Sequence, residues 1–409
     1  MDRELKTWAG VDWGDYRHRV VLITHDGGEQ SSSFANDGTE VNALIAWLRA
    51  RVDDPAELGV ALELPRDPVV DALLQAGFVG FSLNPKQLDR FRDRHSIAGA
   101  KDDQRDAWTL AVSLRTDRGA FRRILADAPW LVRLREATHV LDDLKRELQR
   151  GTNQVRSLLI RYHREPLKLS PAADEPWFWD LLELAPTPSS ANRLRPVRVE
   201  RLLREHRIRR FTAEAVLTTL RGVPLPASDA TAEACAEHLL LLLPRLKLLY
   251  EQRQSCEHRI EQIMDKIPED PVEQKREHRD LDIFRSLPGS GNYVVSTVLV
   301  ESGTAFSRRD YHALRASAGT APVTKQSGRS CRISMRRACN HRLQQAVHHW
   351  AANAMLKDPR LRLIFDRLRS RGCSYGRALR GVADRLLHLL VVLLERDVCY
   401  DISKRQVVA

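Results

Sequence analysis

Residues 8–12 read Trp-Ala-Gly-Val-Asp, a short apolar run that ends in the carboxylate of Asp12. A second apolar run, Arg-Val-Val-Leu-Ile-Thr, follows at 19–24. The turn His-Asp-Gly-Gly at 25–28 then leads into a third run that continues to about Phe34. Apolar runs separated by tight glycine-containing turns are typical of an antiparallel meander. The start of the chain therefore predicts three sequential, hydrogen-bonded strands.

Beyond the meander, helix and strand signals alternate. Apolar residues at helical spacing predict a helix over 41–48, and Leu-Gly-Val-Ala-Leu-Glu at 58–63 predicts a fourth strand. A helix over 69–74, a fifth strand over 78–83 and a helix that opens at Pro85 complete the pattern. A three-strand meander followed by alternating helices and strands matches the element order of an α/β ribonuclease H-like domain.

The region 130–270 has a different periodicity, which predicts long helices. Apolar positions from 239 to 267 follow steps of three and four residues, as in a coiled-coil seam. Pro244 predicts a kink or a late start in that helix. Before it, 170–196 is rich in Pro, Ala and Ser and is interpreted as a loop or insertion, and 193–210 is strongly basic.

The last part, 280–400, is predicted to be globular and mostly α-helical. Leu-Pro-Gly-Ser-Gly at 287–291 precedes a predicted apolar helix over 293–300. A Gly-x-Gly hairpin before a helix can present backbone N–H groups to a phosphate. Gly289 and Gly291 are therefore candidate nucleic-acid contacts in a helix-hairpin-helix-like element, although the same letters also form an ordinary turn.

The composition predicts a folded chain, and its positive charge balance suggests a polyanionic partner. Of the 409 residues, 43% are apolar and 29% charged, which is sufficient for two or three domain cores. The net charge is +11. The apolar runs are shorter than the roughly 20 residues of a membrane span, and the N-terminus lacks the apolar run of a signal peptide. The cysteines form no CxxC pair, so we expect reduced thiols and a cytoplasmic protein.

Four acidic residues of the N-terminal part form a candidate metal site. Asp12 lies in an apolar strand, where an unpaired carboxylate is costly, and Glu63 ends another strand of the same predicted sheet. Asp103 and Asp106 are three residues apart at the start of a predicted helix, so one helix face presents both. Four such carboxylates could hold two divalent ions for phosphodiester chemistry, and oxygen ligands suit Mg²⁺.

Each acid also has a structural interpretation. Asp103 and Asp106 are favourable in the first turn of a helix because of its dipole. Glu63 could be a solvated strand end, whereas Asp12 is the hardest to explain structurally. The joint occurrence of all four in this order of elements favours the metal site.

The window 311–357 contains no Asp or Glu, yet it is rich in arginine. A surface of this kind binds phosphates, and the apolar residues in the window argue against a disordered tail. Ser327 precedes Gly328 within it, which places a small nucleophile on a turn among cations that could stabilise a transferring phosphate. Ser-Gly is also a common turn dipeptide. The candidate nucleic-acid contacts here are Lys325, Arg329, Arg332, Arg336 and Arg337.

These motifs, in this order, resemble the insertion-sequence-one-ten family of DEDD transposases, the bridge-RNA-guided serine recombinases of mobile elements. The N-terminal part is similar to a RuvC-like domain with Asp12, Glu63, Asp103 and Asp106 at its acidic positions. The C-terminal part matches in Leu-Pro-Gly-Ser-Gly, in Phe306, in Ala-Gly at 318–319, and in Pro-x-x-x-x-Ser-Gly at 322–328. The resemblance covers about 8–115 and 284–355.

The resemblance implies a RuvC-like DEDD catalytic domain at 1–125, a coiled-coil oligomerisation region at 126–275, and a transposase domain with the serine nucleophile at 276–409. Ser327 would attack DNA and form a phosphoserine link, assisted by two Mg²⁺ ions for which Mn²⁺ can substitute. The implied partners are donor and target DNA, a structured guide (bridge) RNA, and further copies of the chain in a dimer or tetramer, with no membrane. The implied location is the bacterial nucleoid.

Two departures from the family pattern accompany the resemblance. Asp102 adds an acid beside Asp103, and Cys339 and Gln344 replace a glycine and an arginine. Two other functions remain open at this point: a RuvC-like nuclease or Holliday-junction resolvase that uses water, and a non-catalytic nucleic-acid-binding protein.

Overall fold

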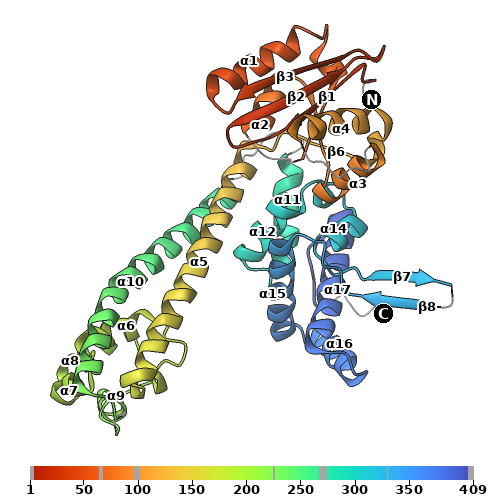
Figure 1. Ribbon diagram of the computed structural model, residues 1–409. Coiled ribbons are helices and arrows are strands. Elements are labelled where there is room, and N and C mark those ends of the chain that lie inside the picture. The colour runs from red at the N-terminus through yellow and green to blue at the C-terminus, as the bar shows by residue number, and fades with distance from the viewer. Residues whose placement is uncertain are drawn as a thin grey trace. The chain divides into compact units, whose positions relative to one another are not determined.

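The computed structural model describes residues 4–63, 68–95, 102–223, 226–266, 274–328 and 330–403. The chain forms two compact units, Met1–Ala128 and Pro129–Ala409, and each is described by itself (Figure 1). In the part of the chain that the structure describes, no helix is long and apolar enough to cross a membrane.

The first unit contains a six-stranded mixed sheet in the order β3-β2-β1-β4-β5-β6. The first three strands pair antiparallel, β4 pairs parallel with β1 and with β5, and β6 is an antiparallel edge strand. The predicted meander and alternation are confirmed, and the mixed sheet with its helices is consistent with a ribonuclease H-like fold. The strands are β1 (Thr7–Asp12), β2 (Arg17–Ile23), β3 (Glu29–Ala35), β4 (Leu58–Leu62), β5 (Val79–Ser82) and β6 (Arg122–Arg123).

Helices cover both faces of this sheet because its strands are apolar on both sides. Ala9 and Val11 share a buried cluster with Leu44 of α1 and Leu73 of α2, whereas the opposite face packs against α4. The helices of the first unit are α1 (Gly38–Arg49), α2 (Pro68–Gln75), α3 (Pro85–His95) and α4 (Asp103–Thr116), with short 3₁₀ turns at Pro55–Glu57 and Arg118–Ala120.

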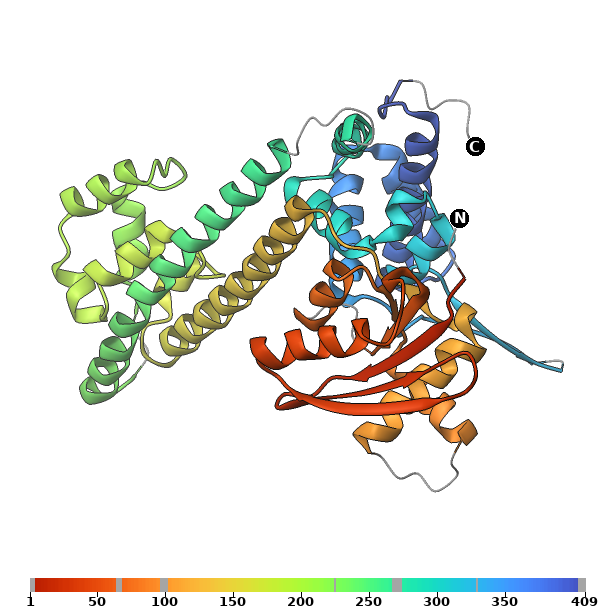
Figure 2. The same ribbon diagram turned by 90° about the horizontal axis from the view of Figure 1, so that it is seen from above.

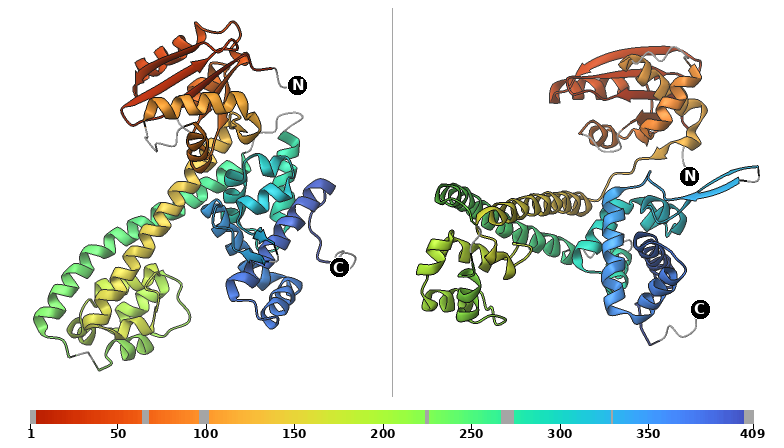
Figure 3. Two further views of the ribbon diagram at one scale, coloured as in Figure 1. Left: turned by 45° about the vertical axis from the view of Figure 1, so that its right-hand side comes forward. Right: turned by 60° about the horizontal axis from the view of Figure 1, so that its bottom comes forward.

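The second unit begins with two long helices, α5 (Pro129–Tyr162) and α10 (Asp229–Asp265), which lie side by side and antiparallel (Figure 3). Gly151 lets them approach closely, because a Cβ there would lie 2.5 Å from Leu246 Cδ2. Pro244 lies inside α10, which continues through it. Supercoiling and pairing with a second copy stay predictions.

The interpretation of 170–196 as a loop is wrong. Helices occupy most of it and continue to Leu220, and they form a small subdomain with its own buried core against α5 and α10 (Figure 2). The helices are α6 (Pro176–Leu184), α7 (Pro188–Arg193), α8 (Pro196–Glu205) and α9 (Ala213–Leu220), after a 3₁₀ turn at Glu165–Lys168.

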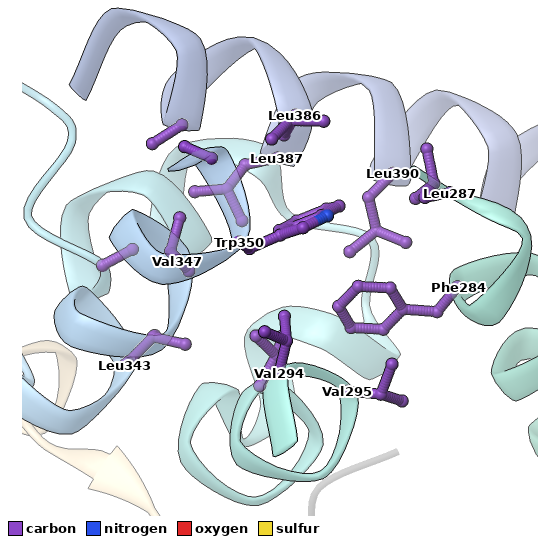
Figure 4. Close-up of a cluster of buried hydrophobic side chains, with 14 of the residues drawn as sticks. Phe284, Leu287, Val294, Val295, Leu343, Val347, Trp350, Leu386, Leu387 and Leu390 are labelled. Carbon is purple, nitrogen blue, oxygen red and sulfur yellow. The ribbon is translucent and has the colours of Figure 1, made fainter. Parts of the chain in front are cut away.

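The C-terminal part is mostly helical, as predicted, and it is built around Trp350, which is fully buried among Phe284, Leu386 and Leu390 (Figure 4). Its indole N–H donates to the Pro288 carbonyl oxygen at 3.0 Å. The helices are α11 (Gln274–Ser286), α12 (Asn292–Ser302), α13 (Thr304–Ser307), α14 (Tyr311–Ser317), α15 (His341–Lys357), α16 (Pro359–Ser370) and α17 (Tyr375–Arg396). One hairpin, β7 (Val323–Ser327) and β8 (Ser330–Ser334), interrupts them.

The Pro-Gly turn before α12 packs closely against α15. Gly289 has a φ of +76°, and a Cβ there would lie 2.5 Å from the backbone nitrogen of Ala354. This close approach accounts for Gly289 structurally, and Gly291 is the exposed N-cap residue of α12. Phosphate binding by the two glycines stays a prediction.

Candidate active site

The N-terminus of α4 lies at the carboxyl end of β1. Gly10 faces α4 so closely that a Cβ would lie 2.0 Å from the carbonyl oxygen of Ala107. Near the other end of α4, the guanidinium of Arg115 lies 5.4 Å from the centroid of the Trp8 ring, near the start of β1. The helix therefore runs antiparallel to the strand. This direction brings Asp106, next to Ala107, to the strand end that contains Asp12.

Asp12 and Glu63 lie at the same edge of the sheet. Val11 is opposite Leu62 in the parallel β1–β4 pair, so Glu63, the next residue, follows in register with Asp12. Side chains alternate between faces along a strand, so Asp12 shares the face of Gly10, and Glu63 that of Ala61. The residues Gly10 and Ala61 both lie on the face of the sheet that α4 covers. Three of the four predicted acids are thus placed toward the same edge of the sheet, and both strand-end carboxylates are half-buried.

Asp106 is 2% exposed and is held by an arginine of α3. The Arg92 Nε lies 2.7 Å from Asp106 Oδ1, and the Arg92 Nη2 donates to Oδ2 at 3.2 Å. A buried carboxylate needs such a partner, because its desolvation is otherwise uncompensated. Sequence analysis did not identify Arg92, and its place within a polar helix, three residues after Asp89, offered no distinguishing signal.

The two acids at the start of α4 have different roles. Asp102 is the N-cap, and its carboxylate accepts from the backbone N–H of Gln104 at 3.1 Å, which is the ordinary capping interaction. Asp103 is exposed in the first turn of the helix, three residues before Asp106. The capping bond explains the extra acid at 102 without a role in metal binding.

The donor chemistry of this edge fits a hard cation, because its ligands would be carboxylate oxygens. Among the residues described, however, no group of three or more His, Cys, Asp or Glu side chains is arranged closely enough to hold a metal ion. Asp106 is instead paired with Arg92. Binding of a cation by Asp106 therefore requires that Arg92 share or release this carboxylate.

Ser327 is the last residue of β7, at the exposed tip of the β7–β8 hairpin (Figure 1). It is opposite Ser330, so the turn consists of two residues, and the first of them, Gly328, has a φ of +54°. A positive φ is typical of such two-residue hairpin turns and favours glycine. The other turn residue, Arg329, lies outside the described residues.

Among the described residues, the cations of the hairpin make no ion pair with a carboxylate. Lys325 is directly opposite Arg332, and both are exposed. Like charges in directly opposite positions destabilise a strand pair, and a hairpin without a covered face is only marginally stable alone. A bound anion would relieve both costs. After β8, Arg336 is half-buried and Arg337 exposed.

The base of the hairpin is anchored to α17. Both oxygens of Asp384 accept from Arg315, at 2.9 and 2.8 Å, and Oδ1 also accepts from the Thr320 hydroxyl at 2.9 Å. The backbone N–H groups of Thr320 and Ala321 donate to the carbonyl oxygen of Arg315. The network fixes the loop that leads into β7. Asp384 was not predicted, since it lies 57 residues after Ser327 within an amphipathic helix.

The motif at 339–344 has a structural role at the start of α15. Asn340 caps this helix by accepting from the N–H groups of Arg342 and Leu343, and it donates to Glu301 at 2.6 Å. Arg342 donates to Glu301 at 2.6 Å and to Asp142 at 2.8 Å. The replacements at Cys339 and Gln344 therefore leave the helix cap intact.

Parts of both units are similar to known transposases. Residues 9–164 match the family of DEDD transposases of IS110 elements, and residues 281–365 match the transposase IS116/IS110/IS902 family. The chain is 31% identical over 412 residues to the mini-circle putative transposase for IS117 of Streptomyces coelicolor, with 97% of this chain and 96% of the relative covered. It is 42% identical over 218 residues to the putative transposase y4uE of Sinorhizobium fredii, with 52% of this chain and 60% of that protein covered.

Proposed function

The chain belongs to the IS110 family of insertion-sequence transposases, and from this premise we propose that it exchanges DNA strands through a phosphoserine bond at Ser327. The observation that supports this proposal most is the place of Ser327. It is an exposed hydroxyl at the tip of a hairpin in a window without a single carboxylate. A cationic surface can hold the phosphate of DNA, and a hydroxyl exposed on it can act as the nucleophile.

In the proposed reaction, the Ser327 hydroxyl oxygen attacks the phosphorus of a DNA phosphodiester. The serine hydroxyl gives up its proton as the new P–O bond forms, the bond from phosphorus to one deoxyribose oxygen breaks, and this oxygen takes up a proton and leaves as a hydroxyl. Lys325 and Arg332 lie two register positions from the tip and would bind the non-bridging oxygens. The energy of the phosphodiester is kept in the serine ester, so a second deoxyribose hydroxyl can reverse the step on another strand.

The acidic edge would hold a divalent metal, as the DEDD domain indicates. The proposed metal is Mg²⁺, bound as two ions, for which Mn²⁺ can substitute. The proposed ligands are Asp12, Glu63, Asp103 and Asp106. When bound, the metal supplies positive charge that neutralises phosphate oxygens. Arg92 keeps the buried Asp106 carboxylate neutralised in the metal-free protein. The proposal further includes a guide RNA, donor and target DNA, and a dimer or tetramer as partners.

The proposal is tested with two serine variants of the hairpin, one of which is the control. The full-length protein, Mg²⁺, the element's RNA and labelled DNA ends are incubated and then analysed under denaturing conditions for protein covalently attached to DNA. Ser327→Ala should abolish the attached species, whereas Ser330→Ala, which changes the opposite serine at the same tip, should retain it. Attached DNA in Ser327→Ala would contradict the proposal. Cleaved DNA with free ends in Ser327→Ala would support a nuclease that uses water.

A further inference from the structure

The helical subdomain of α6 to α9 packs around a buried core of its own and contributes no residue to either half of the candidate site. Trp177, Phe178 and Trp179 are almost fully buried in its core. The Trp179 indole donates to the carbonyl oxygen of Ala173 at 2.8 Å, and the Tyr162 hydroxyl of α5 donates to that of Pro186 at 2.6 Å. The subdomain can therefore present a fixed surface.

Helix α8 gives this subdomain a strongly cationic face. Val199, Leu202 and Leu203 are buried on one side of the helix. The region 193–210 contains eight arginines, two glutamates and no lysine. Five of the arginines recur at every third residue. Arg195 is the N-cap of α8, Arg198, Arg201 and Arg204 lie within it at steps of about 4.5 Å along the axis, and Arg207 lies just beyond its end. All five are exposed: Arg195, Arg198, Arg201, Arg204 and Arg207.

Few of these arginines are neutralised. Arg201 pairs with Glu205 at 2.9 Å, and Arg210 binds both oxygens of Glu175 at 2.6 Å. Within the described ranges, the remaining six make no ion pair with a carboxylate. Like charges at neighbouring helix positions are destabilising, and cations near a helix N-terminus oppose its dipole. The face therefore costs folding stability that an external anion would recover.

Both ends of α8 are held in place. Arg221 donates to the carbonyl oxygens of Ala191, Asn192 and Leu194 at 2.8 to 3.4 Å, which fixes the turn from α7. Beyond the other end, Arg210 binds both oxygens of Glu175, the N-cap residue of α6, at 2.6 Å. Because these contacts fix the helix before any ligand binds, little ordering entropy opposes binding.

The face lacks the apolar centre of a protein–protein interface. Val197, at 72% exposure, is the one large apolar side chain exposed on α8. Guanidinium groups instead match phosphate oxygens in a bidentate geometry. A regular row of them fits a regular row of phosphates better than the irregular carboxylates of an acidic protein surface.

We propose that the arginine face of α8 binds the phosphate backbone of a nucleic acid. This surface deepens the proposed function by adding a contact outside the hairpin and the acidic edge. It contributes affinity and orientation, and no chemistry.

The test uses the full-length protein with Arg195, Arg198 and Arg204 all changed to Gln, three exposed arginines without an ion pair. Binding to an unrelated 25-base-pair DNA duplex and to an RNA hairpin is measured over a range of salt concentrations. For duplex DNA, the slope of log K against log salt should fall by about 2.7, or about 0.9 per lost contact. A matched variant with Lys at the three positions keeps the charge and should keep the slope.

The two nucleic acids distinguish the source of the phosphates. A change in the DNA arm alone identifies DNA as the partner, and a change in the RNA arm alone identifies RNA. An unchanged affinity and slope in both arms would overturn the proposal. The Gln variant should unfold at the same or a higher temperature, since repulsion is removed. Covalent attachment at Ser327 is scored separately, so its absence would refute the proposed function and leave this test intact.

Discussion

The acidic edge of β1, β4 and α4 and the β7–β8 hairpin are opposite in nearly every physical respect. At the edge, Asp106 is buried and paired with Arg92, and the backbones approach at Gly10. At the hairpin, Ser327 is exposed and cations face each other across the strands. In the proposed function, the edge binds a cation and the hairpin binds an anion. Phosphate and metal together would satisfy both, so the distribution of charge is more informative than the net charge of +11.

The largest effect is expected at the acid that ends β1. Asp12→Asn would remove one of the proposed charged metal ligands. The rate of strand cleavage should then fall roughly 10³-fold, which corresponds to about 4 kcal/mol of transition-state stabilisation. Single-turnover cleavage at several Mg²⁺ concentrations measures it. Asp102→Asn is the control, because Asn caps a helix as well as Asp does. Equal losses in both variants would show that the acids of this edge have no distinct roles.

The ion pair at the edge is tested by its removal. Arg92→Ala leaves a buried carboxylate without its guanidinium, which should cost about 3 kcal/mol of folding stability in the absence of metal. Added Mg²⁺ should restore much of this loss by binding the same carboxylate. Thermal unfolding with and without Mg²⁺ checks both statements. If Mg²⁺ raises the unfolding temperature of the variant no more than that of the parent protein, the metal does not bind at Asp106.

The close approach at the edge predicts a steric effect. In Gly10→Ala the new methyl group would meet the carbonyl oxygen of Ala107, so α4 must shift, at a cost of about 2 kcal/mol. Gly38→Ala, at the start of α1, meets nothing within 4 Å and should be neutral. Denaturant unfolding of both variants measures the difference. Similar stabilities would mean that α4 does not contact β1 as described.

The smallest effect concerns the cations of the hairpin. Changing Lys325 and Arg332 together to Gln should weaken DNA binding by about 1 kcal/mol per lost phosphate contact, with cleavage at saturating DNA reduced less. The same change removes a repulsive pair, so the folded protein should not be destabilised. Binding titrations and thermal unfolding check this pair of outcomes. Weaker binding accompanied by a lower unfolding temperature would contradict the view that these cations bind an anion and do not stabilise the fold.

The sequence predicted those elements whose apolar pattern is local. The first five strands of the first unit, and Asp12 as an unusual acid within one of them, were identified in this way, whereas the short edge strand β6 was not. The pairing of Arg92 with Asp106 was not, because it depends on how α3 and α4 pack. The β7–β8 hairpin was missed since neither of its faces is buried, which leaves no alternation to detect.

Prolines misled the interpretation of 170–196. Pro176, Pro188 and Pro196 were taken to indicate a loop, whereas each is the first residue of a helix. Proline is favoured there because its fixed φ suits the helix and its missing N–H is not needed. Pro244 inside α10 shows the converse, since a long packed helix tolerates it.

The most direct test of the account is the chemical identity of the residue that joins DNA. Covalent protein–DNA species formed with Mg²⁺ are isolated, digested with protease and nuclease, and mapped by tandem mass spectrometry. The account predicts a nucleotide attached through phosphate to the Ser327 oxygen. Attachment to another residue, or complete cleavage without any attached nucleotide, would contradict it.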